Sequence, residues 1–178
     1  MRSELKAVDL FCGCGGLSVG LEKAGFKVIG ALDIDPVAIK TYRANHKGVI
    51  SWNKPIEYLS SSVMLKILRI KKGELDLLAG CPPCQGFTPL RTFNGSRSIV
   101  DPRNDLILEF QRLVAELEPR VVMMENVPEL AGDRRFVTFS TALREMGYDG
   151  VWKILDAQDY GSFVDKPMVL LMIHRELG

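Results

Sequence analysis

Short apolar runs rich in Val, Ile and Leu alternate along this chain with stretches whose apolar positions recur at helical spacing. This alternation is typical of βαβ units joined into a mainly parallel sheet. We predict strands over residues 7–11, 27–33, around Ile50, 75–79 and 121–125, and a closing pair over 151–155 and 168–173. We predict helices over residues 17–24, from Pro36 onward, 56–70, 105–117 and 136–146. The pattern therefore predicts one doubly wound α/β domain over residues 1–178, whose mixed sheet ends in an antiparallel strand pair.

One long stretch, residues 80–103, has no apolar periodicity and is rich in proline, glycine and serine. It also carries Arg91, Arg97 and Arg103. Loops of this length inside a compact domain are usually lids or binding loops rather than linkers. We therefore predict a functional loop over these residues.

Composition narrows the class of protein. The chain is 47% hydrophobic and 25% charged, with 23 Lys and Arg against 22 Asp and Glu. This balance excludes a disordered tail and a strongly basic protein that coats nucleic acid, although it leaves nucleic-acid substrates open. No apolar run approaches the ~18 residues of a membrane span, and the start has no signal-peptide layout. We expect a cytoplasmic protein with reduced thiols and no membrane partner.

The first two predicted strands end in residues suited to a nucleoside-type cofactor. After the first strand come Asp9 to Gly16, where glycines let the backbone turn sharply and approach a ligand. After the second strand comes Asp33, whose carboxylate can accept hydrogen bonds from a ribose diol. Gly13, Gly15 and Gly16 give G-x-G-G rather than the dinucleotide fingerprint G-x-G-x-x-G. A tight turn without function is the alternative interpretation.

The next two strand ends carry reactive groups. Pro82 and Pro83 fix the backbone just ahead of Cys84, and Glu125 with Asn126 follows the fifth strand. A thiol and a carboxyl on adjacent strand ends form a candidate pair of nucleophile and general acid.

A zinc site is the alternative use of the cysteines. Cys12-x-Cys14 and Cys81-x-x-Cys84 supply four thiols, but Cys-x-Cys is not a usual structural zinc spacing. His46 and His174 have no partner at ligand spacing. We therefore predict no metal site.

Five segments together resemble the cytosine-C5 DNA methyltransferase family. They are Asp9–Gly16, Asp33-Ile34-Asp35-Pro36, Pro82–Thr88, Asp101-Pro102-Arg103-Asn104 and Glu125-Asn126-Val127-Pro128. They occur in the family's order and at its spacings from the N-terminus to about Gly161. The resemblance implies a Rossmann-like methyltransferase domain that uses S-adenosylmethionine.

The resemblance also implies a role for each matching residue. The residues that match the family's cofactor pocket are Phe11, Gly13, Gly15, Gly16, Asp33, Ile34, Ile56, Pro83 and Leu106. Cys84 would add as a thiolate to cytosine C6, and Glu125 would donate to the ring N3. The family flips the target base of duplex DNA into its pocket. The implied substrate-binding residues are Gln85, Arg91, Arg97, Asn126 and Lys166, and the 80–103 loop resembles the family's mobile catalytic loop.

The chain departs from the family at three points. Pro55-Ile56 replaces the Asp-Ile pair that follows the third strand, with Glu57 the nearby acid that could substitute. The family's Q-x-R-x-R motif is absent, and Lys166 keeps one of its charges without the bidentate contacts of arginine. The target-recognition domain of full-length relatives is also absent. We therefore expect a truncated or split catalytic domain with a second chain that supplies target recognition.

Two other functions stay open on the sequence. An inactive remnant that binds cofactor or nucleic acid would explain the departures. A cytosine-C5 methyltransferase acting on transfer RNA would keep the chemistry and change the substrate.

Overall fold

The computed structural model describes residues 4–83, 106–161 and 166–175. Its strands are β1 (Leu5–Leu10), β2 (Phe26–Asp33), β3 (Ile50–Asn53), β4 (Leu77–Gly80), β5 (Val121–Asn126), β6 (Tyr148–Asp156) and β7 (Pro167–Arg175). Its α-helices are α1 (Gly16–Lys23), α2 (Pro36–Asn45), α3 (Ser61–Leu68), α5 (Leu106–Leu117) and α6 (Arg134–Glu145). Short 3-10 helices are η1 (Ile56–Tyr58), η4 (Pro128–Gly132) and η5 (Ala157–Tyr160).

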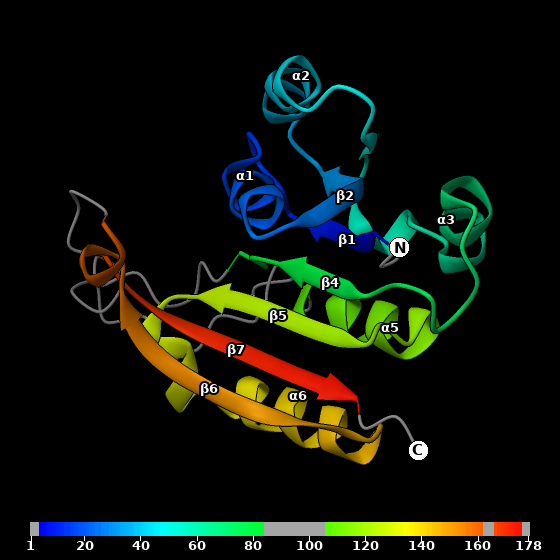
Figure 1. Cartoon of the computed structure of the whole chain (residues 1–178). Coiled ribbons are helices and arrows are strands. Elements are labelled where there is room, and N and C mark those ends of the chain that lie inside the picture. Colours follow the sequence, from blue (N-terminus) through cyan, green and yellow to red (C-terminus); the bar gives the residue numbers. More distant parts are fainter. Residues whose placement is uncertain (1–3, 84–105, 162–165, 176–178) are drawn as a thin grey trace.

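The strands form one sheet in the order β3-β2-β1-β4-β5-β7-β6 (Figure 1). The first five strands are parallel, and β7 is antiparallel to both β5 and β6. The predicted α/β class and the closing antiparallel pair are confirmed. The strand order reverses between β1 and β4, so the crevice beyond the carboxyl ends of these two strands is the expected ligand site.

Helices cover the sheet from both sides (Figure 1). On one face, α1 packs Leu21 against Ala7 and Leu77. On the other face, the largest apolar cluster joins Leu10 and Leu78 to residues of α3, α5 and α6. Because both faces of the central strands are buried, these strands read as nearly continuous apolar runs. The parallel core therefore holds the carboxyl ends of β1, β2, β4 and β5 in fixed positions.

The predicted helix over residues 56–70 is wrong in its extent. Ile56 begins the short η1, the chain becomes extended at Leu59, and α3 starts only after Ser60. The Ser60 hydroxyl accepts from the Val63 amide at 3.5 Å as an N-cap, which competes with a continuous helix. Arg69 then ends α3 in the left-handed region, at φ 55°.

The predicted strand over residues 151–155 is too short. β6 pairs with β7 along its whole length, from Tyr148 opposite Arg175 to Asp156 opposite Pro167. Asp149 and Gly150 interrupt the apolar alternation at the start of this strand, so the pattern of apolar residues does not predict its first three residues. The predicted strand 75–79 is also displaced, because β4 pairs only from Leu77 to Gly80.

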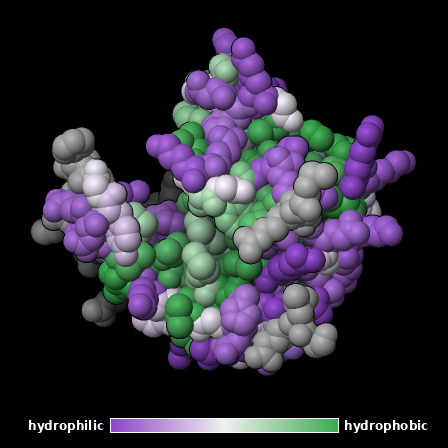
Figure 2. Space-filling model, in the orientation of Figure 1, coloured by the Kyte–Doolittle hydropathy of each residue, from purple (hydrophilic) through white to green (hydrophobic). Residues whose placement is uncertain are grey.

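One face of the antiparallel pair is open. Val151 and Met172 are paired across β6 and β7 and are 62% and 47% exposed. Figure 2 shows apolar residues gathered over β5, β7 and β6 on this side. Among the described ranges, no helix is both long enough and apolar enough to cross a membrane.

Candidate active site

Two adjoining hollows open at the carboxyl edge of the sheet. The larger, of about 480 Å³, lies over the ends of β1, β2 and β4. The smaller, of about 190 Å³, lies over the end of β5 and the start of β7. Cys81 and Pro83 line both hollows, so the two share a wall.

The larger hollow gathers most of the predicted cofactor-binding residues. Six of them line it: Phe11, Asp33, Ile34, Ile56, Pro83 and Leu106. Gly13, Gly15 and Gly16 are not among its lining residues. Apolar walls with a carboxyl group at the rim suit an adenine ring joined to a ribose.

The remaining lining residues were outside the predicted cofactor set. They are Leu32, Lys54, Pro55, Glu57 and Cys81. Glu57 does bring a second carboxyl group to the hollow from η1, as its nearness to the missing Asp-Ile pair suggested. Leu32 ends a buried strand and carries no chemical signal in the sequence. Lys54 lies directly after β3, and the prediction of that strand only around Ile50 did not reach it.

The glycine turn shapes the edge of this hollow through its backbone. Gly13 donates its amide to Asp33 Oδ2 at 2.8 Å, and Gly15 donates to the Cys12 carbonyl at 2.9 Å. Gly13 and Gly15 have φ of 52° and 101°, a left-handed region that favours glycine. Phe11 also lies there, at φ 59°, which costs a residue with a side chain roughly 1–2 kcal/mol. The turn therefore holds Phe11 against the hollow in a strained conformation.

Asp33 is held in place from several sides. Besides the Gly13 amide, its carboxylate accepts the Asp35 amide through Oδ1 at 2.8 Å. Asn53 on β3 donates to the carbonyls of Asp33 and Ile34, at 3.1 and 2.9 Å. Each carboxylate oxygen has a second acceptor site beyond these bonds. Asp33 can therefore accept the two hydroxyls of a ribose without rearranging.

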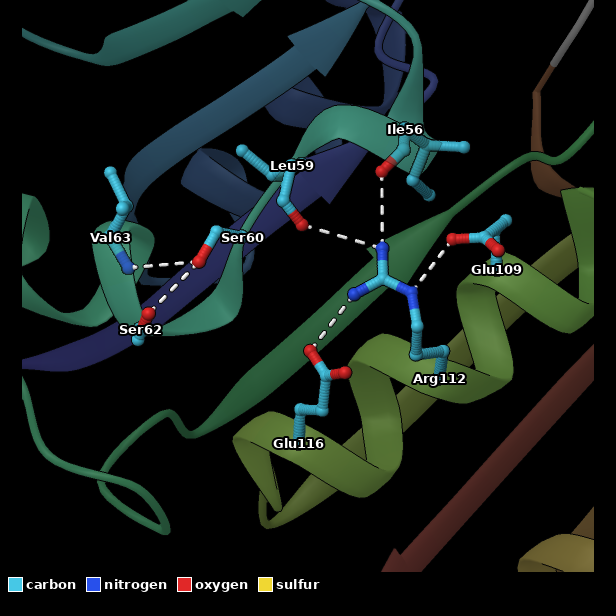
Figure 3. Close-up of polar contacts among 8 residues, drawn as sticks. All are labelled: Ile56, Leu59, Ser60, Ser62, Val63, Glu109, Arg112 and Glu116. Carbon is cyan, nitrogen blue, oxygen red and sulfur yellow. Dashed lines mark hydrogen bonds and ion pairs between the residues drawn. The ribbon is translucent and has the colours of Figure 1, made fainter.

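The wall formed by η1 is fastened to α5 by Arg112 (Figure 3). Its Nη2 donates to the carbonyls of Ile56 and Leu59, at 3.1 and 3.3 Å. Its Nε donates to Glu109 at 2.7 Å and its Nη1 to Glu116 at 2.9 Å. One guanidinium thus binds both ends of the segment from Ile56 to Leu59, which comprises η1 and the extended residue after it.

Removing this guanidinium is expected to loosen the wall. Arg112→Ala leaves the Leu59 carbonyl without a donor among the described residues and the Ile56 carbonyl with the Leu59 amide alone. This loss should lower the free energy of unfolding by about 2 kcal/mol. Urea denaturation followed by circular dichroism measures this change. Arg144→Ala removes an exposed arginine from the last turn of α6 and should change stability by no more than about 0.5 kcal/mol. Equal losses in the two variants would contradict the assigned role of Arg112.

The smaller hollow gathers the predicted catalytic acid and two predicted substrate contacts. Glu125, Asn126 and Lys166 all line it. Asn126 is buried, donates its Nδ2 to the Pro82 carbonyl at 2.7 Å and accepts the Val127 amide at 2.9 Å. Asn126 therefore ties the end of β5 to the segment that leads to Cys84.

Cys81 on the shared wall is a neutral thiol. Burial raises its pKa, and so do the charge of Glu125 and a hydrogen bond between the two side chains. A thiol whose pKa is raised is a poor nucleophile at neutral pH. Cys81 is therefore a poor candidate for the nucleophile. Its hydrogen bond with Glu125 places that carboxyl group beside the wall shared by the two hollows.

Part of the predicted site lies outside the described residues. This part comprises Cys84, Gln85, Arg91 and Arg97, together with the rest of the predicted loop beyond residue 83. In the ranges that the structure describes, no three or more His, Cys, Asp or Glu side chains are grouped as metal ligands. Cys12, Cys14 and Cys81 are free cysteines.

The structure is a doubly wound α/β domain with two adjoining hollows at the carboxyl edge of its sheet. The family model of the C-5 cytosine-specific DNA methylases matches residues 5–163. The chain belongs to this family.

Relatives of known name agree with this assignment. The chain is 35% identical over 170 residues to the type II methyltransferase M.XorII of Xanthomonas oryzae. This alignment covers 93% of the chain and 39% of that relative. It is 32% identical over 169 residues to DNA (cytosine-5)-methyltransferase 1 of Mus musculus. This alignment covers 89% of the chain and 10% of that relative. The chain thus spans about 40% of the bacterial relative and a smaller share of the mouse protein.

Solved structures share the fold. A prophage-encoded protein of E. coli, described as a DNA modification methyltransferase, superposes with a TM-score of 0.81 at 30% identity, over 97% of this chain and 47% of that one. The Dnmt2 methyltransferase of S. pombe superposes with a TM-score of 0.77 at 21% identity, over 99% of this chain and 51% of that one. The second likeness shows the fold alone.

Proposed function

We propose that this chain is the catalytic domain of a DNA (cytosine-5-)-methyltransferase that transfers a methyl group from S-adenosylmethionine to C5 of cytosine. The observation that carries the proposal is the shared wall of the two hollows. A pocket suited to a nucleoside cofactor adjoins a pocket that contains Glu125, and Pro83 between them directly precedes Cys84 in the chain. Donor and acceptor would therefore meet across Cys81 and Pro83.

The residues of the larger hollow fit the cofactor. Ile34, Ile56 and Leu106 offer apolar surface to an adenine ring, and Asp33 offers acceptors to a ribose. Phe11, which leads into the glycine turn, lines the same hollow and is assigned to the methionine part. When bound, S-adenosylmethionine supplies a methyl group made electrophilic by its sulfonium charge.

Two residues are assigned to the activation of cytosine: Glu125, which lines the smaller hollow, and Cys84, which follows Pro83 in the chain. Cys84 adds as a thiolate to C6, which places electron density on C5 and makes it nucleophilic. Glu125 donates a proton to the ring N3 and so stabilises the adduct as negative charge develops. Loss of the C5 proton after methylation expels Cys84 and restores the thiolate. Asn126 holds the Pro82 carbonyl and thereby fixes the approach of the chain to Cys84.

The substrate is proposed to be DNA whose target cytosine leaves the stack. C5 and C6 of a stacked base are not accessible to a thiol and a cofactor at once, so the base must be flipped into the smaller hollow. Lys166 lines that hollow and brings one positive charge to it. Sequence recognition is assigned to a second chain or to further sequence of the kind that the longer relatives contain.

Two measurements test the proposal. Calorimetry should show that the chain binds S-adenosylmethionine with a dissociation constant in the micromolar range. DNA that carries 5-fluorocytosine should form an adduct with Cys84 that survives denaturing electrophoresis, because the fluorine blocks proton loss. A protein that binds no cofactor, or that methylates transfer RNA and not DNA, would overturn the proposal.

A further inference from the structure

The outer edge of the sheet is a long strand. β6 is the last strand in the sheet order, and it pairs with β7 over nine residues in continuous register (Figure 1). The strand at the opposite edge, β3, has only four residues. Proteins usually keep edge strands short, charged or interrupted, because an open edge is a template for pairing with another chain. The length of β6 therefore makes it the edge better suited to such pairing.

The side chains of β6 are apolar and exposed on both faces of the sheet. Six consecutive residues, 149–154, are exposed, and Lys153 is the one charged side chain among the last five of them. Val151 is 62% exposed on the open face. Trp152 and Ile154 are 45% and 55% exposed on the face that carries α6. A contiguous apolar surface of this kind is typical of an interaction site.

The backbone of β6 presents hydrogen-bonding groups to the outside of the sheet. Along an antiparallel strand, residues alternate between bonding one neighbour and facing the other side. The Ala157 amide, one residue beyond β6, donates to the Lys166 carbonyl at 3.2 Å, so the odd-numbered residues face β7. The even-numbered residues, Trp152 among them, then face outward. The Gly150 amide agrees with this orientation, since it donates to the Asp149 side chain at 2.7 Å. The outward groups can therefore bond a further antiparallel strand.

One antiparallel register makes this edge complementary to a second copy of itself. When Val151 lies opposite its own copy, Asp149 lies opposite Lys153 of the partner subunit, and the two-fold axis repeats this charge pair. Gly150 then lies opposite Trp152 of the partner subunit, so an aromatic side chain covers a glycine at the edge. Opposite charges and apolar pairs directly across a ladder both favour pairing. Centring the pair on Lys153 instead would set two like charges opposite each other.

We propose that this chain forms a two-fold dimer in which the two β6 strands pair antiparallel about Val151 and join both sheets into one. The apolar row of Met172 and Val151 on the open face then continues into the same row of the second copy. None of residues 148–154 lines either hollow, so pairing at this edge does not depend on the chemistry proposed for the hollows.

The charge pair gives the first test. Analytical ultracentrifugation of the unaltered chain should show a dimer with a dissociation constant in the micromolar range. Lys153→Asp places like charges opposite each other twice in the dimer and should raise this constant by at least about tenfold. Asp149→Lys should do the same, and the variant with both changes should dimerise again, because the two charges are exchanged across the pair. Lys40→Asp reverses the same charge at an exposed position of α2 and should leave the constant unchanged.

Disulfide cross-linking tests the register. Val151 faces β7, so in the dimer it meets its copy as a pair without ladder hydrogen bonds, where Cα atoms lie about 4.5 Å apart. This separation is within the range of a disulfide. Val151→Cys should therefore form a covalent dimer on oxidation, well above the level of the unaltered chain. Met172→Cys should not, because Met172 is exposed on the same face but lies one strand further from the two-fold axis.

A chain that stays monomeric throughout the micromolar range would overturn the inference, and β6 would then be an edge for a strand of a different protein. A dimer that Lys153→Asp weakens no more than Lys40→Asp does would exclude the charge pair. Equal cross-linking of Val151→Cys and Met172→Cys would exclude the register. Each of these results leaves the proposed function in place, because cofactor binding and methylation are measured independently of dimerisation.

Discussion

Replacing Glu125 with Gln should slow methyl transfer to cytosine by about 10²–10⁴-fold, the range that a positioned general acid contributes. Glu125 is the penultimate residue of β5 and lines the smaller hollow. Glutamine keeps the size of the side chain but cannot give up a proton to the cytosine ring. The adduct with C6 then develops negative charge that no proton neutralises. Single-turnover methylation of a cytosine-containing oligonucleotide measures the rate.

Affinity for the cofactor separates this effect from damage to the fold. Glu125 does not line the larger hollow, so Glu125→Gln should bind S-adenosylmethionine within about twofold of the unaltered chain. Glu129→Gln makes the same chemical change four residues later, at an exposed position in η4, and should retain full activity. A Glu125→Gln variant that methylates at the normal rate would exclude Glu125 as the acid.

The order of the elements could be predicted from the sequence because burial on both faces leaves a plain pattern. Leu77 to Gly80 and Val121 to Met124 are short apolar runs, and the parallel sheet follows from the alternation of such runs with helices. The pairing order of the strands is not contained in such a pattern. The order was not predicted, because it depends on the packing of strands that lie far apart in the chain.

Element boundaries were predicted less well, and for local reasons. Ile56, Leu59 and Met64 have spacings that suit one helix, and all three are buried. In the structure, Ile56 lies in a 3-10 turn, Leu59 is extended and Met64 lies in α3. The helix is not continuous because Ser60 caps α3 and Arg112 donates hydrogen bonds to the carbonyls of Ile56 and Leu59. The hydrogen bond between Arg112 and Leu59, which are 53 residues apart in the chain, thus outweighs the helical spacing of the apolar residues.

The candidate site could be predicted where function depends on one residue type at one strand end. Asp33 and Glu125 follow directly from that logic, since a carboxyl group after an apolar strand stands out. The buried, hydrogen-bonded group of Asp9, Ser18 and Tyr42 could not be predicted in the same way. Asp9, Ser18 and Tyr42 lie on three elements, and only the packing of α1 and α2 against β1 shows that they meet.

Asp33→Ala should weaken S-adenosylmethionine binding by at least about 100-fold. The variant loses the acceptors for two ribose hydroxyls, and hydrogen bonds to a charged group contribute about 1.5–3 kcal/mol each. It also frees the Gly13 amide, which Asp33 Oδ2 holds at 2.8 Å, so the glycine turn loses a constraint at the same time. Calorimetry with S-adenosylmethionine measures the affinity.

Asp35→Ala separates the contact with the ligand from the stability of the neighbouring helix. Asp35 caps α2 by accepting the Val37 amide at 2.8 Å and does not line the larger hollow. Its loss should lower the free energy of unfolding by about 1 kcal/mol and leave cofactor affinity within about threefold. If Asp33→Ala binds the cofactor as tightly as Asp35→Ala does, the ribose is not held at the end of β2. The larger hollow would then be the wrong place for the nucleoside, because Asp33 is the acid that the turn, β2 and Asn53 all converge to position.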